Sequence, residues 1–193
     1  MAEAFKNTLR RGSKGQYGNK PPPPPMETGQ HVAGLISCKN GTKVNQQGET
    51  IDIVKFFFMN QFGHGASLKL AASIWPTSGL SGVLVALSDG AYEPDKADES
   101  GAFEFLNNCV NKWYQIKVKQ SSWMTPDGEE ITWSWVDKKL IRPCHPADAP
   151  KLLPRDHMKM LEAKETADIS DQLRESVVAG TPSEIIDDDD IPF

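Results

Sequence analysis

Aromatic and basic side chains alternate along the segment from residue 113 to residue 139. Four of the five tryptophans of the chain lie in this segment, together with several lysines. Indole rings stack on nucleic-acid bases, at about 1–3 kcal/mol for each stacked base, and ammonium groups bind phosphates. These residue types therefore suit a surface that binds single-stranded nucleic acid. The residues with this chemistry are Trp113, Lys117, Lys119, Trp123, Trp133, Trp135 and Lys139.

A β-hairpin would position these side chains. The sequence Thr-Pro-Asp-Gly-Glu at residues 125–129 is typical of a tight turn, because proline presets φ and glycine accepts a positive φ. We expect a three-residue loop made of Pro126, Asp127 and Gly128. This loop predicts four cross-strand pairs: Trp123 with Ile131, Ser121 with Trp133, Lys119 with Trp135, and Lys117 with Asp137.

The predicted pairing sorts the hairpin side chains onto two faces, because side chains alternate along a strand. The tryptophans and lysines named above share one face, which we expect to be exposed. The opposite face is expected to pack in the core and carries Tyr114, Ile116, Val118, Val136 and Leu140. Tryptophans in strands are also common core residues. A loop longer or shorter by one residue would turn Trp133 and Trp135 inward, so both arrangements stay open.

Residues 28–150 are expected to form a mainly β body. Apolar, β-branched and aromatic runs predict strands over residues 31–38, 51–59, 68–75 and 82–87, before the hairpin strands 113–123 and 131–141. Phe103, Leu106 and Val110 have helical spacing, which predicts a short helix over residues 102–111. A second helix is expected from Pro154 to about residue 166, within a helix and linker region at 151–169. Short strands with few helices favour a small five-stranded barrel.

Charge is distributed unevenly along the 193 residues, whose formal net charge is −5. Residues 1–27 are expected to be a disordered, basic, proline-rich arm in which Arg10 and Arg11 contact a phosphate backbone, with a polyproline II rod at residues 21–25. Residues 170–193 are expected to be a strongly acidic, solvated tail. The body between them is mildly acidic, so its affinity for nucleic acid would depend on where its lysines lie.

The last residues of the sequence combine four aspartates with an apolar end. Ile191 and Phe193 would anchor in an apolar pocket of a partner protein, and the carboxylates would meet a basic rim. Pro192 limits the conformational entropy lost on binding. The segment consists of Asp187, Asp188, Asp189, Asp190, Ile191, Pro192 and Phe193. It resembles the C-terminal tip of bacterial single-stranded DNA-binding proteins.

The resemblance covers only these residues, and the chain as a whole is similar in organisation to phage-encoded single-stranded DNA-binding proteins. It implies an OB-fold body that binds single-stranded DNA without strong sequence preference. It also implies that the tip recruits replication, recombination and repair proteins in the cytoplasm of the bacterial host, without a cofactor. The chain departs from the bacterial pattern in its basic proline-rich arm and in its lack of a long Gly/Gln/Pro-rich linker. The resemblance therefore carries over to residues 187–193 alone, and the sequence does not give the oligomeric state.

Other functions find less support in the sequence. It contains no phosphate loop, HExxH or G-x-S-x-G motif, so no catalytic residue is assigned and an enzyme is not expected. The carboxylates considered for a nuclease metal site are Asp52, Asp89, Asp95 and Asp98, which look like ordinary surface charge. The cysteines and histidines lack zinc-site spacing, so no metal is expected. No apolar run approaches the roughly 20 residues that cross a bilayer. The remaining alternatives are an interaction adaptor, acting through the tip and the proline-rich arm, and a strand-annealing protein.

Overall fold

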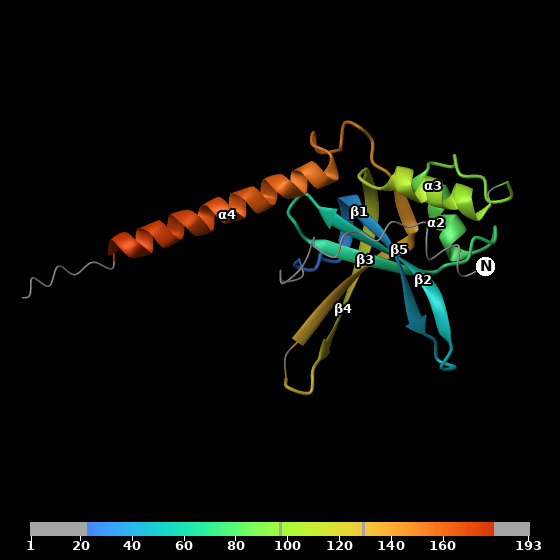
Figure 1. Cartoon of the computed structure of the whole chain (residues 1–193), viewed down its shortest axis with the longest axis horizontal. Helices are drawn as coiled ribbons and strands as arrows, with labels where there is room; N and C mark the ends of the chain where they lie inside the picture. Colours follow the sequence, from blue (N-terminus) through green and yellow to red (C-terminus); the bar gives the residue numbers. More distant parts are fainter. Residues whose placement is uncertain (1–22, 97, 129, 180–193) are drawn as a thin grey trace, which may run out of the picture. The chain divides into compact units, whose positions relative to one another are not determined.

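The computed structural model describes residues 23–96, 98–128 and 130–179 (Figure 1). The strands are β1 (Gly29–Val44), β2 (Thr50–Asn60), β3 (Gly65–Ala71), β4 (Trp113–Met124) and β5 (Glu130–Pro143). Helices α2 (Gly79–Leu87) and α3 (Glu99–Cys109) lie between β3 and β4, and α4 (Pro154–Ala179) follows β5. The chain divides after Met158 into two compact units, so the strands, α2, α3 and the first turn of α4 belong to one unit.

The five strands form one sheet that closes on itself. Hydrogen-bonded neighbours follow the order β1-β2-β3-β5-β4, and β4 pairs with β1 to complete the ring. Neighbouring strands are antiparallel, except that β3 and β5 meet in parallel where Ser67 lies opposite Trp135. The described part of the chain is therefore mainly β, as the sequence predicts.

Alternation along the strands fills the inside of the ring with apolar side chains. Phe56 and Phe58 of β2 are fully buried, and the Phe58 ring meets the Tyr114 ring edge-on at a centroid distance of 6.3 Å. Leu84 of α2 and Leu106 of α3 belong to the same buried cluster. Each large apolar side chain removed from water contributes about 1.5–3 kcal/mol. The core thus holds the sheet and both helices in one unit.

Helix α2 occupies the region where the sequence predicted a strand over residues 82–87. Ser78 caps the helix, since its hydroxyl accepts a hydrogen bond from the Ser81 backbone N–H at 3.1 Å. The helix then buries Leu80, Val83, Leu84 and Leu87 at helical spacing. The strand prediction was wrong because a short continuous apolar run suits a buried strand and a buried helix equally. By contrast, α3 lies close to the predicted helix at residues 102–111.

The β4–β5 hairpin has the predicted register near its turn. Gly128 has a φ of 83°, and its N–H donates to the Thr125 carbonyl at 3.0 Å, as a tight loop requires. Three of the four predicted pairs are therefore confirmed: Trp123 with Ile131, Ser121 with Trp133, and Lys119 with Trp135.

A bulge in β5 removes the fourth predicted pair, Lys117 with Asp137. Ile116 pairs with Ile141 and Val118 pairs with Val136, so Lys117 alone lies opposite residues 137–140. The extra residues reverse the side-chain alternation of β5. Ile141 is consequently buried, and Leu140, which was expected in the core, is 47% exposed. The other residues expected in the core are buried: Tyr114, Ile116, Val118 and Val136.

Both ends of the folded region extend beyond the limits expected from the sequence. The N–H of Gly65 donates to the Pro24 carbonyl at 2.7 Å, and the N–H of Met26 donates back to the Gly65 carbonyl at 3.0 Å. Met26 is fully buried, so residues 23–27 belong to the body rather than to a disordered arm. Helix α4 continues to residue 179, within the region expected to be a solvated tail. Arg10, Arg11 and residues 187–193 lie outside the described residues.

Gly34 marks the place where the first turn of α4 packs on β1. A Cβ atom at Gly34 would lie 2.3 Å from the Cβ and 2.5 Å from the Cγ of Pro154. Because the proline ring is rigid, we expect Gly34→Ala to lower the free energy of unfolding by about 1–3 kcal/mol, the usual cost of overpacking. Urea unfolding followed by circular dichroism measures this change.

Gly82→Ala is the matched control. Gly82 is an exposed residue inside α2, where an added Cβ would meet nothing within 4 Å. Alanine is the better helix former, so this substitution should raise the free energy of unfolding by about 0.5–1 kcal/mol. The same effect from both substitutions would contradict the close contact between Gly34 and Pro154.

Candidate nucleic-acid interface

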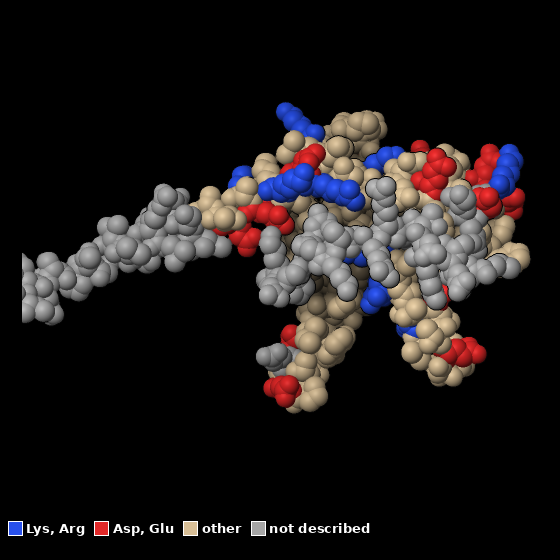
Figure 2. All heavy atoms as spheres, viewed as in Figure 1, with Lys and Arg blue, Asp and Glu red and all other residues tan. Residues whose placement is uncertain are grey.

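The β1–β2 and β4–β5 hairpins extend from the ring as two arms (Figure 1). Acidic side chains lie at the end of each arm, and basic side chains lie near the base of the arms (Figure 2). Glu49 belongs to the turn that joins β1 to β2, and Asp127 belongs to the turn that joins β4 to β5. An anionic strand would therefore be attracted to the base of the arms and repelled from their tips.

Three tryptophans share the outer face of the β4–β5 hairpin. Trp123 is 54% exposed and Trp133 is 43% exposed, while Trp135 is half-buried. The predicted exposure is therefore confirmed for Trp123 and Trp133, and Trp135 shares their face, so the inward arrangement is excluded. Ser121 and Lys119 are the cross-strand neighbours of Trp133 and Trp135. Exposed indole rings on a sheet surface are the side chains on which bases stack.

Three exposed lysines continue this outer face across the neighbouring strands. Lys39 of β1 lies opposite Lys55 of β2, and Lys55 lies opposite Lys69 of β3. The Nζ atom of Lys69 lies 4.9 Å from the centre of the Trp133 ring, within cation–π range. We call Lys39, Lys55 and Lys69 the lysine row. We call the outer surface that carries Trp123, Trp133 and Trp135 the tryptophan face, and Lys69 connects the lysine row to it.

Within the lysine row, Lys55 and Lys69 place like charges directly opposite each other. Like charges directly opposite each other destabilise a sheet. Among the described residues, neither Lys55 nor Lys69 forms a salt bridge. The Lys55 side chain lies over Gly41, where an added Cβ would come within 2.9 Å of its Cε and Nζ atoms. A bound polyanion would relieve the repulsion between Lys55 and Lys69.

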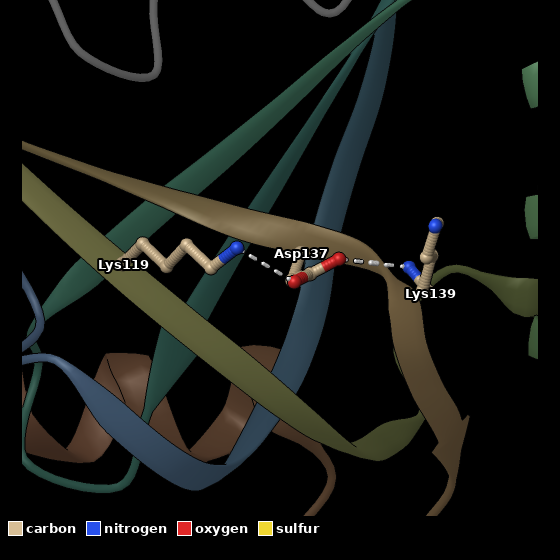
Figure 3. A network of polar contacts seen from close by, with 3 residues as sticks. All are labelled: Lys119, Asp137 and Lys139. Carbon is tan, nitrogen blue, oxygen red and sulfur yellow. Dashed lines mark hydrogen bonds and ion pairs between the residues drawn. The ribbon is translucent and has the colours of Figure 1, made fainter.

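Asp137 lies between Lys119 and the backbone of Lys139 (Figure 3). The Nζ atom of Lys119 is 3.0 Å from Oδ2 of Asp137, and the Lys139 N–H donates to Oδ1 at 3.1 Å. The Lys139 N–H, followed by the ammonium of Lys119 and the more distant charge of Lys117, lowers the pKa of the Asp137 carboxyl. The carboxylate therefore stays charged down to a pH below its ordinary pKa and partly neutralises Lys119.

A single strand on this outer face would meet the Asp137 carboxylate, so replacing Asp137 by asparagine is expected to strengthen its binding. Asparagine keeps an oxygen that can accept the Lys139 N–H but removes the charge beside Lys119. Two unit charges at 4 Å interact by about 1 kcal/mol in water, so the affinity should rise by about two- to fivefold at low salt. Titration of a labelled oligonucleotide at low and high salt measures this rise, which should fade as salt increases.

Asp127→Asn provides the control for this charge change, because Asp127 is an exposed carboxylate at the tip of the same hairpin. Its replacement should alter the affinity much less than that of Asp137. An equal gain from the two substitutions would mean that net charge alone determines binding.

Trp113 packs within the unit and does not belong to the exposed face. It is 9% exposed, and its Nε1–H donates to the Leu152 carbonyl at 2.8 Å. The His157 ring meets it edge-on at a centroid distance of 5.9 Å. The expectation of an exposed Trp113 was wrong because residues that follow β5 cover the start of β4. Lys117 and Lys139, also expected beside the tryptophans, lie at the bulge.

No protein-family model matches the chain, and no curated protein sequence matches it significantly. The chemistry of the outer face is therefore the evidence on function.

Sequence reasoning missed the lysine row. Lys55 stands between the buried residues Val54 and Phe56, so alternation alone would have turned it outward. The same pattern applies to Lys69, which follows the buried Leu68. The row itself depends on the registers of two strand pairs, β1 with β2 and β2 with β3, which the local sequence does not fix.

The part of the chain that the structure describes offers little for metal binding or for catalysis by a thiol. It contains no cluster of three side chains suited to a metal ion. Cys38, Cys109 and Cys144 are free thiols, and burial raises the pKa of Cys109 and of Cys144, which lowers their reactivity. None of the described helices is both long enough and apolar enough to cross a membrane.

Proposed function

We propose that this protein binds single-stranded DNA without strong sequence preference and protects it during replication, recombination or repair. One observation carries the proposal: the tryptophan face and the lysine row form one continuous outer surface, joined where Lys69 lies over Trp133. Every base has a π-face, so stacking on Trp133 and Trp135 tolerates any sequence, while lysines meet the phosphates. No cofactor takes part in this binding.

We also propose that the ring is an OB-type barrel. Its support is the strand order β1-β2-β3-β5-β4, with two helices between β3 and β4. In OB-folds, the face of the second and third strands and the loops joining strands 1–2 and 4–5 bind oligonucleotides. Lys55 and Lys69 belong to β2 and β3, and the two arms are the β1–β2 and β4–β5 hairpins. The candidate surface thus coincides with the part of an OB-fold that would bind DNA.

A separate role is proposed for residues 187–193, on the basis of their resemblance to the tip of bacterial single-stranded DNA-binding proteins. Ile191 and Phe193 would bind an apolar pocket on replication or recombination proteins of a bacterial cytoplasm, and the aspartates would meet basic residues around it. The ring would hold the DNA while this segment recruits the partner. Removing residues 187–193 should therefore abolish recruitment and leave the stacking surface intact.

Fluorescence anisotropy of labelled oligo-dT, with a duplex of the same length for comparison, tests DNA binding. We expect the single strand to bind at low salt, with log affinity falling by about 0.7 per phosphate contact for each decade of salt. The duplex should bind far more weakly, because its bases cannot reach the tryptophans. Added Mg²⁺ should leave the strand intact, whereas a nuclease would cleave it. No binding of oligo-dT at low salt would refute the proposal and favour the interaction adaptor.

A further inference from the structure

A second cationic surface lies where β5 bulges away from β4. A groove of about 480 Å³ opens between the start of β1 and this bulge. Its volume falls within the range of about 300–1,000 Å³ that is typical of small-ligand sites. Lys117, Lys139 and Arg142 line the groove together with His31, and none of the described residues that line it is acidic.

The bulge determines where these cations lie. Lys117 is the single β4 residue opposite residues 137–140 of β5, which include Lys139. Asp137 holds the bulge in shape by accepting the Lys139 N–H at 3.1 Å. Arg142 donates from Nε to Oε1 of Gln115 at 2.8 Å, which anchors one edge of its guanidinium on β4. A guanidinium has five N–H donors, so this contact leaves donors for an anion.

The groove combines charge with apolar surface. Leu140, 47% exposed, lines it together with Val32, which is half-buried. Planar guanidinium groups and ammonium groups bind phosphate oxygens, and an apolar wall suits a sugar or a base. This combination of residues fits a nucleotide unit better than a simple inorganic anion.

The groove also adjoins the tryptophan face. Lys117 and Lys119 are two residues apart on β4, so alternation directs them to the same side of the strand. Asp137 lies between Lys119, beside Trp135, and Lys139, in the groove (Figure 3). A strand stacked on the tryptophans would therefore pass the Asp137 carboxylate as it reaches the groove.

We propose that the groove binds a phosphodiester and its nucleotide from the same DNA strand that stacks on Trp133 and Trp135. The inference rests on the proposed function and extends it. The binding site would then continue past the hairpin, around the bulge, to the start of β1. A short oligonucleotide would fill only the tryptophan face, whereas a longer one would fill both parts.

The test compares two oligo-dT lengths, about 6 and about 16 nucleotides, which bracket the usual site sizes of OB-folds. The variant is Lys117→Gln/Lys139→Gln, which removes two groove cations without touching the tryptophans. We expect a roughly 50-fold loss of affinity for the long strand at about 50 mM salt, with a salt slope smaller by about 1.4. The affinity of the short strand should stay within about twofold, in line with its separate site.

The control is Lys112→Gln/Lys151→Gln, which removes two exposed lysines that line neither the groove nor the tryptophan face. It should leave both affinities nearly unchanged. Equal losses of affinity for the two lengths, or no loss for either, would overturn the groove as a nucleotide site while leaving the proposed function in place. Failure of the unaltered protein to bind either length would overturn both.

Discussion

Replacing Trp133 and Trp135 together by alanine is expected to weaken binding of oligo-dT by about 2–6 kcal/mol, because each stacked base contributes about 1–3 kcal/mol. This range corresponds to a loss of about 30-fold to more than 10⁴-fold in affinity. The two side chains lie on the outer face, where Trp133 is 43% exposed and Trp135 is half-buried. Anisotropy titration of a labelled oligonucleotide measures the loss.

Two further variants separate stacking from folding. Trp133→Phe/Trp135→Phe keeps aromatic rings and should restore most of the affinity, since stacking tolerates a change of ring. Trp75→Ala removes a tryptophan that is 74% exposed on the loop before α2, and it should leave the affinity nearly unchanged. Unaltered binding by the alanine double variant, with its fold verified by circular dichroism, would exclude the hairpin as the stacking surface.

The double substitution Lys55→Thr/Lys69→Thr should weaken DNA binding while leaving the fold at least as stable. Each lost phosphate contact reduces the salt slope by about 0.7, so two contacts reduce it by about 1.4. Between about 50 mM and about 1 M salt this difference amounts to a roughly 50-fold loss of affinity at the lower concentration. Titrations across this range give both the slope and the affinity.

Stability gives the second measurement for this variant. Threonine is a better strand former than lysine, and its introduction removes two like charges that lie directly opposite each other. The midpoint of urea unfolding should therefore stay the same or rise. Weaker binding together with a large loss of stability would indicate that these lysines support the fold, contrary to the proposed role. A salt slope equal to that of the unaltered protein would also contradict it.

The hairpin is the part of the fold that the local sequence determines best. A proline, an aspartate and a glycine at residues 126–128 set the loop, and the loop sets the register back to Lys119 and Trp135. The prediction fails beyond Val118, since the bulge at residues 137–140 has no strong local signal. The bulge reverses the side-chain alternation of β5 after residue 136, so Ile141 takes the core position that was expected for Leu140.

Other errors come from tertiary contacts that short segments do not encode. The apolar run in α2 suits either a strand or a helix, and only the cap at Ser78 distinguishes them. Trp113 follows the same alternation as Lys117, yet residues after β5 cover it. Its indole N–H donates a hydrogen bond to the Leu152 carbonyl. The lysine row needs three strands in register, so it became recognisable only once the ring was known.

Fluorine NMR of protein labelled with 5-fluorotryptophan tests the central claim most directly, because the chain has only five tryptophans to resolve. Single Trp→Phe variants assign each signal. We expect oligo-dT to shift the signals of Trp133 and Trp135, to leave the buried Trp113 unchanged, and to lose its effect at high salt. Shifts confined to Trp75, or no shift at a concentration where the strand is bound, would contradict a stacking surface on the β4–β5 hairpin.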